Sequence, residues 1–108
     1  VSGAGGDIIE ISAAGYSYGA GAHTVVAAAA VAAGGGGAAT ARNIVVDTAA
    51  NLNVDKSANF GGAALAYDTT NNRILFDADG DFTAGSVIIG TVAGITGGTP
   101  DANNFDIV

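Results

Sequence analysis

The chain of 108 residues contains no cysteine, methionine or tryptophan, and its only histidine is His23. Without cysteine there are no disulfide bonds, no thiol chemistry and no zinc sites built from thiolates. A single histidine cannot hold zinc unless carboxylates are recruited, and no Gly-x-Ser-x-Gly motif presents a nucleophilic serine. We therefore expect His23 to have a structural or surface role, and we expect the protein not to be an enzyme.

Basic residues are scarce. Ten acidic residues against three basic ones give a net charge of -7, and the basic residues are Arg42, Lys56 and Arg73. This balance argues against nucleic acid as a partner, because binding to phosphates needs a basic face that releases counterions. It also argues against anionic membrane surfaces. It favours divalent cations instead, since clustered carboxylates repel one another until a cation neutralises them.

A long apolar run is also missing. The longest, residues 24–33, is dominated by alanine and is shorter than the roughly 20 residues of a membrane-spanning helix, so we expect no membrane insertion. Alanine favours helix more than any other residue, so residues 22–33 are predicted as a short alanine-rich helix that ends at Gly34. A strand is the alternative, because Val25, Val26 and Val31 are β-branched.

Short β-branched runs bounded by Gly, Asp and Asn occur along much of the chain. Their spacing of about 8–14 residues predicts a mainly β fold, a single β-sandwich or β-roll-like domain. The polar residues 68–72 lie between two such runs and predict a hairpin whose loop contains a type I turn. The expected strands are residues 7–11, 43–47, 63–67, 73–77, 86–92 and 105–108.

The segment Asp77-Ala78-Asp79-Gly80-Asp81 places three carboxylates in one predicted turn. Calcium is bound by about six to eight oxygens, and Gly80 permits the positive φ that a tight wrap needs. The segment is not an EF-hand loop, because its glycine is at position 4 and Ile88 stands at position 12. We predict calcium ligands at Asp77, Asp79 and Asp81. The alternative is a solvated turn between strands.

Residues 2–10 follow the nonapeptide calcium repeat Gly-Gly-x-Gly-x-Asp-x-U-x, with Ser2 in place of the first glycine. Gly5 and Asp7 are therefore further candidate calcium ligands. One repeat cannot form a roll, because at least three must stack to enclose a core. This copy is either the last rung of a roll that precedes Val1 or a Gly-rich turn.

The chain ends in acidic and amide residues followed by a short apolar segment, residues 101–108. With the two acidic motifs, this end resembles the C-terminal region of RTX-type (hemolysin-type calcium-binding) proteins exported by type I secretion. The resemblance implies a β-hairpin module after calcium repeats, an uncleaved C-terminal secretion signal and a location outside the bacterial cell. It covers roughly residues 43–108 and is carried by residues 44–48, 62–69, 73–81 and 104–108.

Two departures from that family bear on function. The array of nonapeptide repeats is missing, and the Ala/Gly-rich middle is longer than a plain linker needs to be. We expect one secreted β-rich module over residues 1–108. It consists of a Gly-rich arm, residues 1–22, with one degenerate calcium repeat, and a β-hairpin region, residues 43–108, with a tail that resembles a secretion signal.

The first functional hypothesis is an extracellular structural protein at the bacterial cell surface. Small side chains and low charge suit a surface-layer or filament subunit that self-assembles with copies of itself, with calcium as the cofactor. The alternative is the C-terminal secretion and folding module of a larger RTX toxin, protease or adhesin. A carbohydrate-binding β-sandwich is the weakest hypothesis, because three tyrosines, four phenylalanines and no tryptophan leave few stacking platforms.

Overall fold

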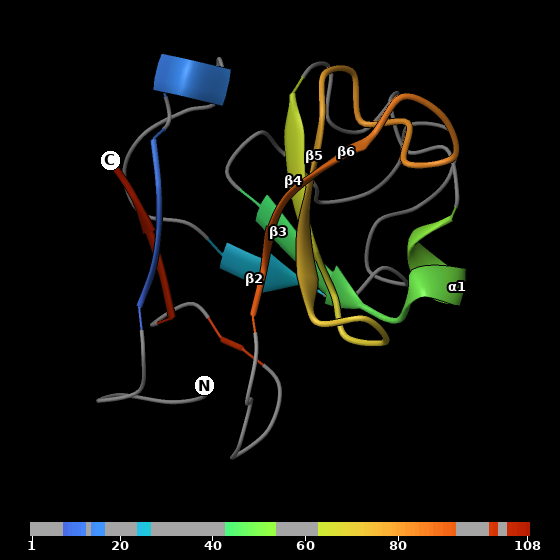
Figure 1. The fold of residues 1–108 in the computed structure, drawn as a ribbon, viewed down its shortest axis with the longest axis horizontal. Coiled ribbons are helices and arrows are strands. Elements are labelled where there is room, and N and C mark those ends of the chain that lie inside the picture. The colour runs from blue at the N-terminus through green and yellow to red at the C-terminus, as the bar shows by residue number, and fades with distance from the viewer. Residues whose placement is uncertain are drawn as a thin grey trace.

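The computed structural model describes residues 8–12, 14–16, 24–26, 43–53, 63–92, 100–101 and 104–108. These residues are mainly strands in two sheets, with one short α-helix, and they confirm the prediction of a small, mainly β domain (Figure 1). The elements are β1 (Ile9–Ile11), a 3-10 turn (Ala14–Tyr16), β2 (Thr24–Val26), β3 (Asn43–Asp47), α1 (Ala49–Leu52), β4 (Ala64–Asp68), β5 (Arg73–Asp77), β6 (Val87–Thr91) and β7 (Phe105–Ile107).

The larger sheet has five strands in the order β2-β3-β4-β5-β6. Strands β2, β3 and β4 run parallel, and β5 and β6 continue the sheet antiparallel. The smaller sheet is the parallel pair of β1 and β7, in which Ile9 lies opposite Phe105 and Ile11 opposite Ile107. Segments from the two ends of the described chain therefore lie side by side (Figure 1).

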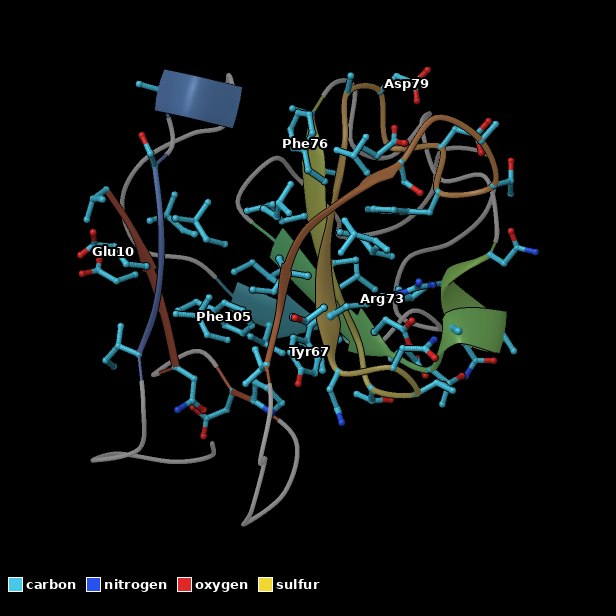
Figure 2. The ribbon with its side chains drawn as sticks, in the orientation of Figure 1. Glu10, Tyr67, Arg73, Phe76, Asp79 and Phe105 are labelled. Carbon is cyan, nitrogen blue, oxygen red and sulfur yellow. The ribbon has the colours of Figure 1, made fainter. Side chains whose placement is uncertain are left out.

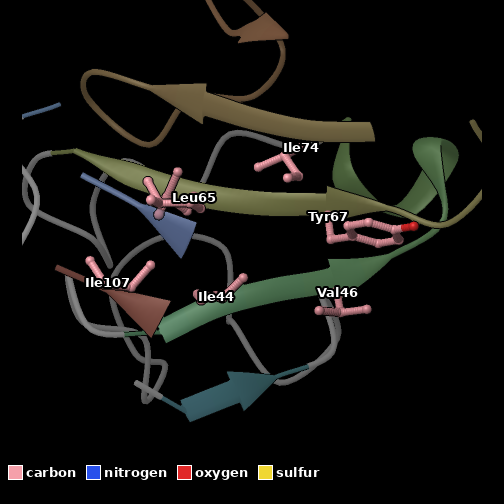
Figure 3. Packing of buried hydrophobic residues seen from close by; sticks show 7 residues of the cluster. Ile44, Val46, Leu65, Tyr67, Ile74 and Ile107 are labelled. Carbon is pink, nitrogen blue, oxygen red and sulfur yellow. The ribbon is translucent and has the colours of Figure 1, made fainter. Parts of the chain in front are cut away.

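Side-chain alternation along β3, β4 and β5 gives the five-stranded sheet two buried faces. One face packs against the β1–β7 pair, and the other is covered by α1 and the loop after β5 (Figures 1 and 3). The first cluster contains Ile11, Ile44, Val46, Leu65, Tyr67, Ile74 and Ile107. The second contains Val45, Leu52, Ala64, Ala66, Leu75 and Phe82.

The hairpin between β4 and β5 is confirmed. Asp68 lies opposite Arg73, so residues 69–72 form the loop. Asn72 ends the loop with a φ of 51°, a left-handed conformation that asparagine adopts more readily than most residues. The Asn72 carbonyl also accepts a hydrogen bond from the Val92 N–H at 2.8 Å, which joins the loop to the end of β6.

The predicted helix over residues 22–33 is wrong where the structure describes it. Thr24–Val26 form β2, with Val25 opposite Ile44 of β3, and residues 22–23 and 27–33 lie outside the described residues. Sheet pairing of three β-branched residues prevails here over the helix propensity of the alanines that follow. The α-helix instead lies at Ala49–Leu52, where the Thr48 side chain accepts a hydrogen bond from the Asn51 N–H.

Tyr67 is almost fully buried, yet its hydroxyl has no hydrogen-bond partner among the described residues. Burial, and then the negative charge of Asp68, raise the pKa of this hydroxyl. A buried polar group without a partner loses its hydration without compensation. We expect Tyr67→Phe to raise the free energy of unfolding by about 1 kcal/mol in urea denaturation. A loss of stability in this variant would show that the hydroxyl is satisfied and would contradict the prediction.

Candidate functional site: a sheet face lined with aspartates

Three neighbouring strands, β3, β4 and β5, end in aspartate: Asp47, Asp68 and Asp77. Side chains two positions apart in a strand lie on the same face of a sheet. Val45, Ala66 and Leu75 stand two positions before the three aspartates and belong to the core cluster that α1 covers. All three aspartates therefore lie on that face. Asp47 and Asp68 are opposite each other in parallel strands. Asp77 lies at the other end of the face, because β5 is antiparallel to β4.

Asp68 is fully buried, and both of its carboxylate oxygens accept hydrogen bonds. Oδ1 accepts from the N–H groups of Thr70 at 2.8 Å and Asn71 at 3.3 Å. Oδ2 accepts from Asn71 Nδ2 at 2.7 Å and from Arg73 Nε at 2.8 Å. Burial raises the pKa of this carboxyl, but the hydrogen bonds outweigh burial and hold the pKa below its ordinary value. Asp68 is therefore a buried, ionised anchor for the hairpin loop.

Asp47 binds the loop that begins α1 through hydrogen bonds to its side chain. Its Oδ1 accepts from the Thr48 N–H and from Asn51 Nδ2, both at 2.8 Å. The two loops also bind each other, because the Thr69 N–H donates to the Asp47 carbonyl at 2.9 Å and the Ala49 N–H donates to Thr70 Oγ1 at 3.1 Å. The sequence signal for this arrangement is an Asp-Thr pair after each of two apolar strand segments, residues 44–46 and 63–67.

The predicted calcium loop is organised around Asp77, whose side chain is 2% exposed. Its Oδ1 accepts from the N–H groups of Asp79 at 3.0 Å, Gly80 at 2.8 Å and Asp81 at 3.1 Å. Gly80 has the positive φ that the sequence predicted, 85°. The carboxylate of Asp77 thus holds the turn that places Asp79 at its exposed tip (Figure 2).

The other two acidic side chains of this loop also bind backbone. Asp79 Oδ1 accepts from the Asp81 N–H at 3.0 Å, and Asp81 Oδ1 accepts from the N–H and hydroxyl of Thr83. Burial raises the pKa of Asp77, and the nearby Asp79 carboxyl raises it further, against the lowering effect of the backbone N–H groups. Asp77 and Asp79 are therefore close together, while Asp81 is engaged with Thr83.

The described residues contain no group of three His, Cys, Asp or Glu side chains placed to hold a metal ion. The loop accordingly offers an adjacent carboxylate pair, Asp77 and Asp79, which is a partial ligand set for calcium. The two ligands predicted near the N-terminus, Gly5 and Asp7, lie outside the described residues, as does His23.

A cavity of about 480 Å³ opens on the same sheet face, between α1 and the ends of β5 and β6. Arg73 and Asp68 form its polar part, and Leu52, Leu75, Phe82 and Ile88 are among its apolar walls. This cavity is not visible in the sequence, because its lining residues come from separate segments of the chain.

Comparison with known proteins gives no relative: no family model, no curated protein and no solved structure matches the chain. The resemblance to RTX-type proteins therefore stays a prediction. Among the residues that the structure describes, no helix has the length and apolar character needed to cross a membrane.

Proposed function

We propose that the protein is an extracellular structural module of the bacterial cell surface that assembles with copies of itself. The observation that supports this most directly is strand β6. Within the described residues β6 pairs only with β5, so it forms an edge of the five-stranded sheet (Figure 1). An edge strand presents unpaired N–H and C=O groups to which a second chain can add a strand.

Exposed apolar side chains on β6 leave this edge open to pairing. Val87 is 50% exposed and Ile88 54% exposed, and the strand from Val87 to Thr91 contains no charged residue and no proline. Soluble proteins usually protect such edges with lysine, proline or a covering segment. Pairing of β6 with β6 of a second copy would cover both strands in one symmetric contact.

The net charge of -7 opposes this association, because two copies repel each other. Calcium bound at the Asp77–Asp81 loop would reduce that repulsion. Burial, and then the nearby Asp79 carboxyl, raise the pKa of Asp77, and a bound cation would relieve the repulsion between the two carboxylates. Backbone carbonyls, Asp81 and water would have to supply the remaining oxygens. We therefore propose that calcium favours the assembled form.

The calcium proposal predicts a condition-dependent effect of Asp79→Asn. The amide keeps an oxygen that can accept from the Asp81 N–H but removes the charge that a cation would bind. We expect the wild type to be stabilised by calcium, by about 2.7 kcal/mol at 100 times the Kd, and the variant to be stabilised much less. Thermal unfolding in calcium and in a chelator measures both. Asp79→Ala and Asp81→Ala should each lower the thermal stability more in calcium than in chelator. An equal loss in the two conditions would mean that the loop is only a turn.

The edge proposal predicts that a charge on β6 prevents assembly. Val87→Lys places an ammonium group on the exposed edge, where pairing with a second copy would bury it. We expect this variant to sediment as a monomer under conditions in which the wild type assembles. The matched control is Ala50→Lys, which makes the same change of charge at an exposed position of α1 and should assemble normally. Assembly of both variants alike would rule out β6 as the contact.

A further inference from the structure

We infer that the cavity beside α1 binds a small monocarboxylic acid with an aliphatic tail, and that Arg73 holds its carboxylate. This inference does not rest on calcium, but the cavity shares Ile88 with the proposed assembly edge, so its test is made in a chelator, where we expect little or no assembly. The cavity volume of about 480 Å³ falls within the range of roughly 300–1,000 Å³ of pockets that hold small ligands. Its lining combines polar residues, among them Asp68, Arg73 and Ser86, with a wall of apolar side chains.

The polar group that points to a carboxylate is the guanidinium of Arg73. Its one hydrogen bond within the described residues is from Nε to Asp68 Oδ2. Both oxygens of Asp68 already accept two hydrogen bonds each, so the ion pair uses one edge of the guanidinium and leaves its terminal amino groups for another acceptor. Arg73 extends from β5 toward α1 (Figure 2), and its side chain is 32% exposed. A guanidinium fork matches the two oxygens of a carboxylate.

The apolar walls define the rest of the ligand. Leu75 and Phe82 form the inner part of the cavity, because both belong to the buried cluster on this face. Ile88 lines the cavity and yet is 54% exposed, so its side chain presents apolar surface that an aliphatic tail would cover. Burying that surface adds binding free energy in proportion to its area.

The charge of the site selects a singly charged ligand. Asp68 neutralises the charge of Arg73, and the protein as a whole carries -7. Because Asp68 already offsets the charge of Arg73, hydrogen bonds to the guanidinium rather than net charge would hold a carboxylate. The second negative charge of a phosphate ester or a dicarboxylate would meet no further cation among the described lining residues. A monocarboxylate needs one guanidinium edge, and its tail contributes the remaining binding free energy by covering apolar surface.

The test is titration of the isotope-labelled protein with hexanoate, followed by NMR in a chelator, with three comparison ligands. Acetate lacks the tail, hexanol lacks the charge, and inorganic phosphate carries more charge without a tail. We expect hexanoate to bind about tenfold more tightly than each of these. The signals of the Arg73 side chain, Leu75 and Ile88 should shift on binding.

Two variants separate the ligand site from the stability of the fold. Arg73→Lys keeps the charge but loses the fork, and should weaken hexanoate binding about tenfold. Because Arg73 also pairs with buried Asp68, Ser86→Glu provides a second variant, which adds a carboxylate to the cavity lining and leaves that pair intact. Its matched control is Ala84→Glu, with the same charge change at an exposed residue that does not line the cavity.

Ser86→Glu should weaken hexanoate binding at least as much as Arg73→Lys, and Ala84→Glu should leave it unchanged. Hexanoate binding no tighter than that of hexanol would overturn the inference. Equal binding by wild type and Ser86→Glu would overturn it as well.

Discussion

Replacing Asp68 with alanine lowers the free energy of unfolding by about 3 kcal/mol at neutral pH, which is the largest effect we expect from a single polar substitution. The variant removes the acceptor for two N–H groups of the hairpin loop, for Asn71 Nδ2 and for Arg73 Nε. It also leaves the Arg73 guanidinium without its counter-charge. Urea denaturation of wild type and variant measures the difference.

The effect of Asp68→Ala depends on pH in a defined direction. The folded-state pKa of Asp68 lies below its ordinary value, so its stabilisation is complete above the unfolded-state pKa of about 3.9 and is lost as the pH falls through the folded-state pKa. The difference between wild type and variant should therefore be large at neutral pH and small in strong acid. A difference that stays constant over this range would show that the ionised carboxylate is not the anchor.

Replacing Asp77 with alanine has the second largest expected effect, a loss of about 2 kcal/mol. Its carboxylate oxygen accepts from three consecutive N–H groups, and the Gly80 N–H is in a buried position. Asp77→Asn is the matched control, because the amide oxygen can accept the same hydrogen bonds. Asp77→Asn should retain most of the stability in chelator and lose the stabilisation by calcium. A loss in Asp77→Asn as large as in the alanine variant would contradict this account of the loop.

The pH dependence of Asp77 has the opposite sign to that of Asp68. Its folded-state pKa is raised, so the folded protein holds the proton more tightly than the unfolded chain. Stability from this group falls as the pH rises from the unfolded-state pKa through the folded-state pKa, and it returns on acidification. In chelator, Asp77→Asn should lack this fall. Paired denaturation series of the wild type and the variant across acid to neutral pH test the sign.

The local parts of the fold could be predicted from the sequence. Residues 43–47 and 73–77 are strands with the expected bounds, because short runs of β-branched, aromatic and other apolar residues ended by polar turn residues carry their own signal. The hairpin loop followed from residues 68–72 in the same way. The parallel pairing of β2 with β3 and of β1 with β7 could not be predicted, since these contacts join segments far apart in the chain.

In the candidate site, too, only the local features could be predicted from the sequence. The acidic segment 77–81 and the positive φ of Gly80 were visible in the sequence, because glycine among aspartates is a local turn signal. The sequence could not show that the Asp77 carboxylate binds backbone N–H groups, or that Arg73 pairs with Asp68 beside a cavity. Those features depend on which face of the sheet each side chain occupies. The short helix α1 was missed because four residues after a threonine cap carry too little periodicity.

We propose that copies of this chain assemble through an exposed sheet edge, with calcium favouring assembly. The most direct measurement is the assembly state of the purified protein in millimolar calcium and in chelator, determined by sedimentation and electron microscopy. We expect ordered assemblies of the wild type in calcium, fewer or none in chelator, and none for Val87→Lys. A protein that stays uniformly monomeric at every calcium concentration would contradict it.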